Sequence, residues 1–176
     1  VKRVLSGEPA DLPAGLQAEG CESGRQWTWD GVEFRLWHWP QARDSNQNSC
    51  VLQITANGER LLLSGDIDSS AERALLDSPL AVPTDWLQAP HHGSRSSSSM
   101  ALLNVLQPKA VLISRGQGNS FGHPHAVVIA RYRNRGTAIY DSAQQGAVHL
   151  QLGRFEPPRA MRQERRFWRD PPPPGK

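Results

Sequence analysis

The chain contains little that marks a membrane protein or a disulfide scaffold. Apolar runs such as Leu61–Leu63 and Ala110–Ile113 are far shorter than the roughly 20 residues that a membrane-spanning helix needs. Two cysteines, Cys21 and Cys50, form no metal-type cluster and are too few to define a disulfide framework, so they leave the redox compartment open. The length of 176 residues fits one ordinary globular domain.

The chain also lacks a recognisable start and an evenly spread charge. It begins at Val1 without a signal-type segment, so we expect it to start inside a longer protein. Residues 154–176 carry seven Lys/Arg against three Asp/Glu, whereas residues 1–153 carry thirteen against fourteen. The tail could contact nucleic acid through its arginines and Trp168. Its proline run and low apolar content instead favour a solvated, flexible terminal segment.

Residues 1–25 show no clear periodicity, and we expect an irregular lead-in. Two hairpins then follow. The first joins alternating residues around Trp27 to a strand at 32–36 across Asp30-Gly31, and the second joins 50–55 to 60–64 across Asn57-Gly58. Asn-Gly and Asp-Gly are typical of two-residue hairpin turns because these residues tolerate positive φ.

Beyond Gly65 the pattern changes to alternating strands and helices, which favours the α/β class with parallel strands. Ser69 and Glu72 have the spacing of a capping box at the start of a helix. Further strands are expected at 85–89 and 109–114, and further helices at 100–106 and from Pro124 to Gly136. We expect a final strand pair, 137–140 with 147–152, across Gln144-Gln145-Gly146.

Polar residues gather in the loops that follow these strands, where functional groups of α/β sheets collect. Asp66 follows one strand, His91 and His92 follow the next, and His123 precedes the last helix. Carboxylate oxygens and imidazole nitrogens together suit zinc or manganese. Each residue alone has a simpler explanation, since Asp66 would cap a turn and His123 would cap a helix. Ser94 and the run Ser96–Ser99 would either bind an anion at a helix start or form a flexible loop.

Taken together and in this order, four strings resemble the C-terminal metallo-β-lactamase-like domain of ComEC-type DNA-internalisation competence proteins, over about Gly24 to Leu152. They are Asn48-Ser49-Cys50-Val51-Leu52, Leu62-Leu63-Ser64-Gly65-Asp66-Ile67, Ala89-Pro90-His91-His92-Gly93-Ser94, and Ser114-Arg115-Gly116 through Asn119-Ser120-Phe121-Gly122-His123-Pro124-His125. Single pieces of this set are not specific, but the combination is.

The resemblance implies an αββα sandwich with two divalent metal ions, zinc or manganese, at the ends of its sheets. It implies Asp66 as a bridging metal ligand and His91 as a later ligand, with the choice between His91 and His92 open. It further implies His92 and His123 as catalytic groups, and Ser94 and His125 as substrate contacts. The expected domain boundaries are 1–25 for the lead-in, 26–153 for the metallo-β-lactamase-like part, and 154–176 for the basic tail.

The resemblance also has a gap. The superfamily anchors its metals with a His-x-His-x-Asp-His motif, and these 176 residues contain no such pattern. We therefore expect the chain to be the C-terminal half of the domain, inactive alone and prone to self-association through an uncovered sheet edge.

The family implies a nuclease that degrades the strand not taken up, attached on the periplasmic side to an inner-membrane channel. Whether the chain is an enzyme stays open. The alternatives are a non-catalytic module that binds DNA or the channel, and a hydrolase of small phosphoesters.

Overall fold

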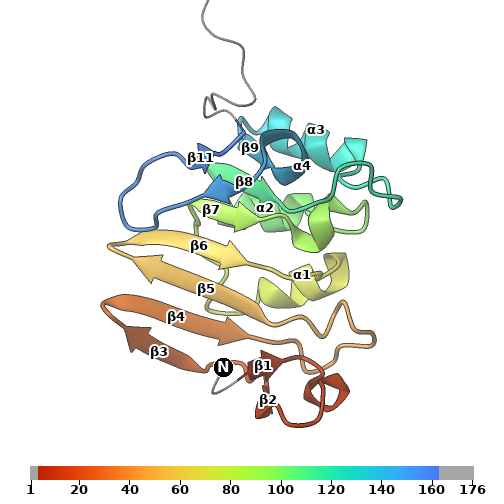
Figure 1. Cartoon of the computed structure of the whole chain (residues 1–176), viewed down its shortest axis with the longest axis vertical. Coiled ribbons are helices and arrows are strands. Elements are labelled where there is room, and N and C mark those ends of the chain that lie inside the picture. Colours follow the sequence, from red (N-terminus) through yellow and green to blue (C-terminus); the bar gives the residue numbers. More distant parts are fainter. Residues whose placement is uncertain (1–3, 163–176) are drawn as a thin grey trace, which may run out of the picture.

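The structure is a computed structural model that describes residues 4–162. Within that range the chain forms one seven-stranded sheet and two two-stranded sheets. The strands of the large sheet lie side by side in the order of the sequence, from β3 to β9 (Figure 1). They are β3 (Gln26–Trp29), β4 (Val32–Trp37), β5 (Val51–Ala56), β6 (Glu59–Leu63), β7 (Trp86–Gln88), β8 (Ala110–Ile113) and β9 (Ala138–Asp141).

The first half of the sheet is antiparallel. β3 pairs with β4 across Asp30-Gly31, and β5 pairs with β6 across Asn57-Gly58. Asp30 and Asn57 both have a φ of 49°, a conformation that Asp and Asn adopt more readily than most other residues. Both predicted hairpins are confirmed.

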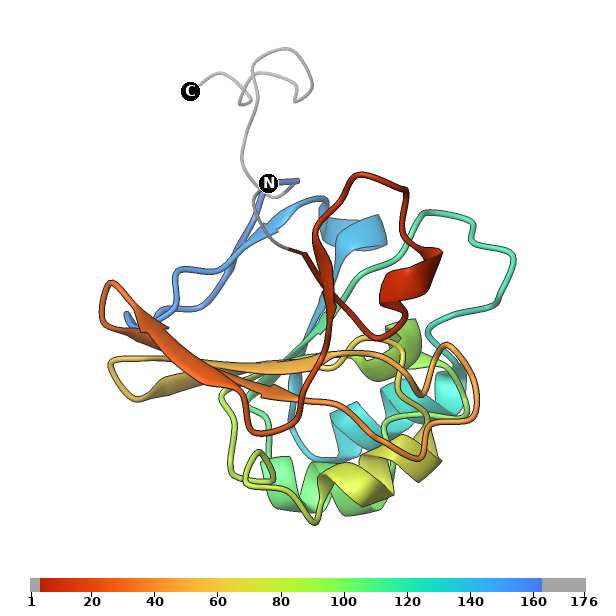
Figure 2. The same cartoon turned by 90° about the horizontal axis from the view of Figure 1, so that it is seen from below.

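The second half is parallel, because β6, β7, β8 and β9 all run in the same direction. Each crossover contains one α-helix: α1 (Ser69–Leu75), α2 (Met100–Leu106) and α3 (Ala126–Asn134). The 3₁₀ helix η2 (Pro90–Gly93) precedes α2 in the second crossover. Crossovers between parallel strands are right-handed, and the strands follow one another in sequence order. All three helices therefore lie on one face of the sheet (Figure 2). The main core fills the space between them and includes Leu62, Ile67, Leu75, Leu87, Leu102, Leu103, Leu106 and Val111.

The helix starts differ in one respect from the predicted capping box. Asp68, not Ser69, is the N-cap of α1, and its side chain accepts hydrogen bonds from the Ser70 and Ala71 amides. Glu72 reaches across to α2 instead, where its carboxylate accepts the amides of Ser98 and Ser99. The capping-box prediction is therefore wrong, because Glu72 finds its donors in a segment 26 residues further along the chain.

The predicted final strand pair is also wrong. β9 pairs in parallel with β8, and the residues that follow it form the short helix α4 (Ser142–Gln145). Asp141 accepts the amide of Ala143 as the N-cap of α4, so the chain begins a helical turn at the point where the prediction placed a hairpin. β10 (Val148–His149) pairs with β11 (Arg159–Ala160).

The N-terminal segment contains more order than the sequence indicated. We expected an irregular lead-in at 1–25, yet β1 (Val4–Ser6) and β2 (Ala18–Gly20) pair in parallel there, with the 3₁₀ turn η1 (Pro9–Asp11) between them. A disulfide joins Cys21 to Cys50, with their Cα atoms 5.8 Å apart. Three residues per strand are too few to produce a visible alternation, so this pairing left no periodic signal in the sequence.

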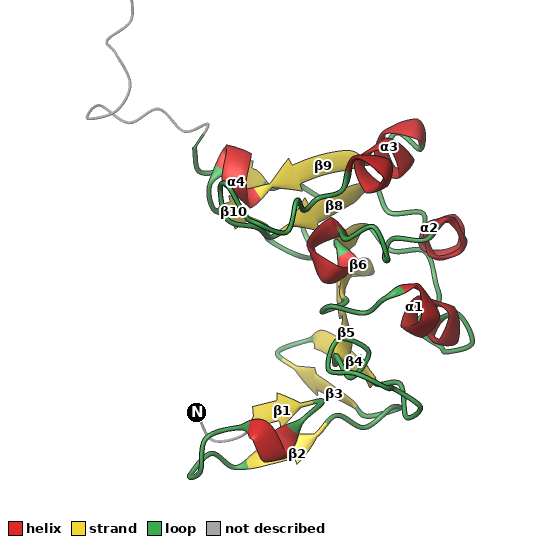
Figure 3. Cartoon of the chain, turned by 90° about the vertical axis from the view of Figure 1, so that its right-hand side faces the viewer, coloured by secondary structure: helices red, strands yellow, loops and turns green. Residues whose placement is uncertain are grey.

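The three helices α1, α2 and α3 lie on one side of the large sheet, and β1, β2, α4 and β10 lie on the other (Figure 3). The large sheet and its layer of crossover helices thus form one β layer and one α layer of an αββα sandwich. None of their helices has the length and apolarity needed to cross a bilayer. Most of the predicted basic tail, Trp168 included, lies outside the described residues.

Candidate functional site

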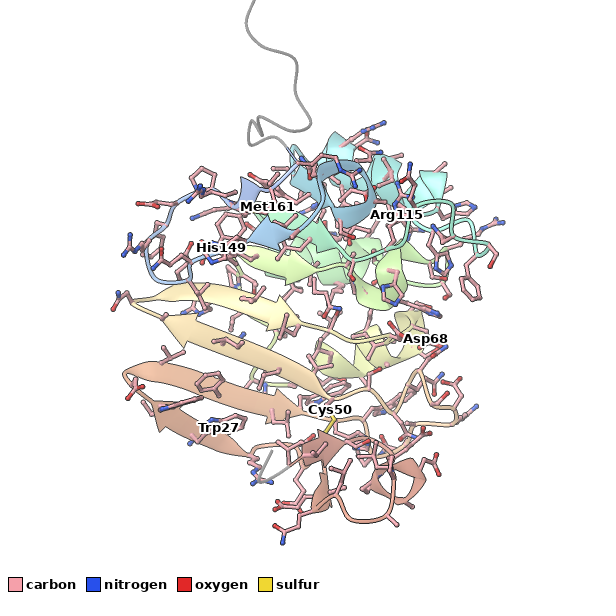
Figure 4. All side chains as sticks on the ribbon, in the orientation of Figure 1. Trp27, Cys50, Asp68, Arg115, His149 and Met161 are labelled. Atoms are coloured by element: carbon pink, nitrogen blue, oxygen red, sulfur yellow. A yellow bond between two sulfur atoms is a disulfide. The ribbon has the colours of Figure 1, made fainter. Side chains whose placement is uncertain are left out.

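Three loops meet at the rim where the parallel strands end. Asp66 follows β6, His91 and His92 follow β7, and His123 lies between β8 and α3. Nε2 of His92 is 3.4 Å from Oδ1 of Asp66. The rings of His91 and His123 meet edge to face, with centroids 5.5 Å apart. The structure therefore brings together the Asp and His side chains that the sequence singled out on these loops. The same rim carries Asp68 and Arg115, which are labelled in Figure 4.

The backbone at Asp66 is held against the start of β5. The amide of Asp66 donates to Oγ of Ser49 at 2.9 Å. Gly65 has a φ of 57°, and a Cβ at this position would lie 2.7 Å from Cβ of Ser49. Only glycine combines this conformation with so close an approach. Ser49 and Gly65 therefore fix where the Asp66 carboxylate can lie.

The two adjacent histidines have an unusual backbone. His91 has a φ of 48° and His92 a φ of 54°, and left-handed backbone costs about 1–2 kcal/mol per non-glycine residue. The amide of His91 donates to the carbonyl of Gly65 at 3.0 Å, which ties the second loop to the first. Such strain is often retained at functional sites, where the surrounding structure holds it in place.

His92 is oriented by its second ring nitrogen. Its Nδ1 lies 2.7 Å from the carbonyl oxygen of Ser114, so Nδ1 carries a proton and donates it to that oxygen. In the neutral ring, Nε2 then presents a lone pair to the Asp66 carboxylate, and two acceptors face each other. A second proton on the ring or a cation between the two groups resolves this contact. Metal-ligating histidines typically show the same arrangement, with the other ring nitrogen donating to a carbonyl or carboxylate.

His91 and His123 differ from His92 in their surroundings. Nδ1 of His91 is buried and has no hydrogen-bond partner among the described residues. Burial, together with the neighbouring charges of His91 and His92, lowers the pKa of His123 below its usual 6.5. His123 is therefore neutral at neutral pH.

The two residues predicted to contact substrate are both engaged in local structure. Ser94 is buried, and its hydroxyl lies 3.1 Å from that of Ser96. His125 is the N-cap of α3, and its Nδ1 accepts the amide of Val127 at 3.2 Å. Its own amide donates to the carbonyl of Gly93, so it also ties α3 to the second loop.

The serine run is neither a flexible loop nor a free anion site. Ser97 and Ser98 are 1% and 0% exposed, and Ser99 caps α2 by accepting the amide of Leu102. The Glu72 carboxylate takes the amides of Ser98 and Ser99, so the anion at this position belongs to the protein. Burial raises the pKa of Glu72 despite these two hydrogen bonds.

A partly buried ion pair joins the ends of β8 and β9 at the far side of the rim. Nη2 of Arg115, directly after β8, is 2.7 Å from Oδ2 of Asp141 at the end of β9. Nε of Arg115 donates to the same carboxylate at 2.8 Å. A cavity of about 310 Å³ lies between this pair and the histidines, and it is lined by His92, Ser114, Arg115, Gly116, Asn119, Phe121 and His123.

A second, larger cavity of about 720 Å³ adjoins the first. The two share Arg115, Asn119 and His123 among their lining residues, so both border the loop that carries His123. The larger cavity is lined by Asp141 and Gln144 near the rim and by Arg133 and Thr137 near the opposite end of β9. Pro124, Ile129 and Ile139 add apolar side chains to this lining.

The described residues do not complete a metal site. Within residues 4–162, no three His, Cys, Asp or Glu side chains are arranged to hold a metal ion. Asp66 and His92 face each other, but the second carboxylate of the loop, Asp68, is committed to capping α1 and to the amide group of Gln47. A zinc site takes three or four protein ligands, so two donors are too few, and no chemical step can be assigned to a metal on these residues alone.

Several residues that shape the site were not singled out for it in the sequence. Ser49 positions Asp66, the carbonyl of Ser114 orients His92, and Asn119 braces the loop around His123 through two side-chain hydrogen bonds. All three lie in the four strings that carried the resemblance, so the signal was present. It did not show which atoms of those strings meet.

Comparison with known proteins places these observations in context. Residues 23–117 match the family model described as the metallo-beta-lactamase superfamily. The chain is 33% identical over 177 residues to competence protein ComA of Neisseria gonorrhoeae, and this match covers 87% of this chain and 25% of that protein. It is 28% identical over 109 residues to ComE operon protein 3 of Bacillus subtilis, which covers 62% of this chain and 14% of that protein.

The chain thus spans a quarter or less of the length of these curated relatives. Among solved structures, the metallo-beta-lactamase fold protein YhfI from Bacillus subtilis matches with a TM-score of 0.46 and 7% identity, over 79% of this chain and 61% of that one. The similarity to competence proteins of the ComEC type and the α/β fold class, both expected from the sequence, are confirmed.

Proposed function

Because the chain belongs to the metallo-β-lactamase superfamily, we propose that it is part of a DNA-uptake protein and that its rim site cleaves phosphodiester bonds of DNA. The strand attacked is the one that is not taken up. The observation that carries the proposal is the meeting of Asp66 and His92 beside His91 and His123 at the ends of parallel strands. Relatives named as competence proteins support the DNA-uptake setting.

We assign Asp66 and His92 as the pair that faces a cation. When the His92 ring is neutral, its Nε2 and the Oδ1 of Asp66 are both acceptors and lie close together without a proton between them. The Ser114 carbonyl fixes this tautomer of His92 by accepting a hydrogen bond from its Nδ1. His91 also stays a candidate ligand through its unpartnered Nδ1. In the intact domain we infer two divalent ions, zinc or manganese, whose remaining ligands come from outside the described residues. Such ions supply charge stabilisation on phosphate oxygens when bound.

The other side chains bind and orient the phosphodiester. His123 is neutral at neutral pH, so one ring nitrogen donates a hydrogen bond to a phosphate oxygen or to the leaving oxygen. In His125, Nδ1 accepts the amide of Val127, so the proton of the neutral ring is on Nε2, which is the atom available as a donor to substrate. The amide of Ser94 donates to the carbonyl of His91, and its predicted contact with substrate remains a proposal.

The disulfide supports the expected location. A bond between Cys21 and Cys50 persists in oxidising compartments such as the bacterial periplasm and is rare in the cytosol. We therefore propose that this domain lies on the periplasmic side of the inner membrane, next to the channel portion of a longer polypeptide. We also propose self-association through β3, the edge strand of the large sheet, whose residues are all exposed.

The direct test is cleavage by the longer protein that contains this chain. Plasmid DNA is incubated with manganese and with the unaltered protein or its Asp66→Asn, His92→Gln and His91→Gln variants. We expect Asp66→Asn and His92→Gln to lose nicking by at least about 10- to 100-fold, the range typical for loss of a group that orients a metal ligand. His149→Gln is the matched control, because His149 is exposed on β10, away from the rim.

Retained nicking in Asp66→Asn would overturn the proposed site. Loss in His91→Gln with retention in His92→Gln would keep the site and exchange the two histidines. Cleavage of small phosphodiesters but not of DNA by the unaltered protein would replace the nuclease with a hydrolase of small phosphoesters. Sedimentation of the chain at increasing concentration tests the edge contact, and a monomer throughout would refute it.

A further inference from the structure

Phe121 is exposed beside the site. The side chain is 80% exposed, and no other large hydrophobic residue in the described part of the chain is as exposed. Its ring stacks near His123, with centroids 5.9 Å apart and an angle of 28° between the planes. The ring therefore presents a flat apolar face to solvent beside His123, one of the side chains gathered at the rim.

The loop that carries Phe121 is braced. Asn119 accepts the amide of His123 through Oδ1 at 3.1 Å and donates to the carbonyl of His123 through Nδ2 at 2.7 Å. Gly122 completes the turn with a φ of 68°. Because the Asn119 side chain binds the backbone of His123 twice, the residues between them, Phe121 included, are held in a closed loop. The exposure of Phe121 is therefore built into the loop.

The surroundings of the ring suit a nucleotide. Phe121 lines the cavity of about 310 Å³ that also contains His92, His123 and Arg115, and this volume lies at the lower end of the range for small-ligand pockets. The adjoining cavity shares Arg115, Asn119 and His123 with it and is also lined by Arg133. An aromatic face beside hydrogen-bonding imidazoles matches a base and the phosphate next to it.

We propose that Phe121 stacks on an unpaired base of single-stranded DNA, next to the phosphodiester bound at the rim. The inference rests on the proposed function and narrows its substrate to DNA that is single-stranded at the site. A base inside a duplex has neighbours on both faces and cannot offer one to Phe121, whereas an unpaired base can. Stacking tolerates any sequence because every base has such a face.

The test measures binding by the 176-residue chain and does not require cleavage. Fluorescence anisotropy follows a labelled oligo(dT), an abasic strand of the same length, and a blunt duplex at low ionic strength. We expect Phe121→Ala to weaken oligo(dT) binding by roughly 5- to 150-fold, the range that corresponds to loss of one base–aromatic stack. Binding of the abasic strand should not change, and Phe121→Trp should retain the affinity for oligo(dT).

The matched control is Phe155→Ala. Phe155 is 56% exposed, but its amide donates to Glu59 at the start of β6, at the opposite end of the sheet from the rim. Equal affinities of the unaltered chain for oligo(dT) and the abasic strand would overturn the inference, and so would unchanged oligo(dT) binding by Phe121→Ala. The outcome is separate from that of the nicking assay, since base-dependent binding can hold where cleavage fails, and cleavage can persist where Phe121 proves unimportant.

Discussion

Removing the disulfide between Cys21 and Cys50 should destabilise the whole domain and loosen the site. The bond ties the end of β2 to the residue before β5. Ser49, next to Cys50, accepts the amide of Asp66. The same covalent link therefore fixes the N-terminal segment and the support of the Asp66 loop.

The magnitude follows from the length of the closed loop. The two cysteines are 29 residues apart in sequence, and closing a loop of that length in the unfolded chain costs about 12 cal/mol/K, or about 3.6 kcal/mol at 25 °C. For a chain of this size, 1 kcal/mol corresponds to roughly 2–4 °C in the unfolding midpoint. We expect the midpoint to fall by about 7–14 °C when the bond is absent.

Thermal unfolding followed by circular dichroism measures this shift in the oxidised chain, in the chain with reductant, and in the Cys21→Ala/Cys50→Ala double variant. The reduced chain and the double variant should unfold at similar temperatures, and reductant should not affect the double variant. Equal midpoints for the oxidised and reduced chain would refute the reasoning, because the bond would then lie outside the cooperative unit that contains the sheet.

Two further predictions concern the support of the site and the opposite end of the sheet. Gly65→Ala should lower the free energy of unfolding by about 2–4 kcal/mol in denaturant titration, because the new Cβ would lie 2.7 Å from that of Ser49 at a φ of 57°. Gly58→Ala, also at positive φ but with nothing within 4 Å, should cost only about 1 kcal/mol, and equal losses would contradict the close contact. For Asp85, burial alone would raise the pKa, but the hydrogen bond and charge of Lys109 and the hydrogen bond from the Arg60 amide lower the pKa below 3.8. The ionised carboxylate therefore stabilises the folded state at pH values above its unfolded pKa. This stabilisation is lost as the pH falls through the folded pKa. Asp85→Asn should therefore cost about 1 kcal/mol at pH 7 and progressively less as acid protonates the carboxyl group, and a difference independent of pH would contradict this assignment.

The local elements of this chain could be predicted where short-range chemistry decides them. Asp30-Gly31 and Asn57-Gly58 set the two hairpins because each turn is fixed by the conformations of its own residues. The helix expected at 100–106 likewise matches α2. The order of polar residues after the strands predicted a shared rim, because parallel strands end on the same side of a sheet.

Pairing between distant segments could not be predicted in this way. Cys21 and Cys50 gave no hint of their bond, and β9 joins β8 rather than the strand that follows it along the chain. Glu72 had the spacing of a local cap, yet its carboxylate binds the start of another helix. In each case the partner is chosen by how helices and strands pack, which no local pattern records.

The same division holds at the site. The sequence by itself determined which loops carry the Asp and His side chains, because the positions of strand ends follow from local patterns. Only the tertiary structure decided that His92 faces Asp66 while His91 packs against His123. The physical reason is that the direction of a side chain depends on backbone angles and on contacts such as that of His92 with Ser114, and these exist only once the strands have assembled.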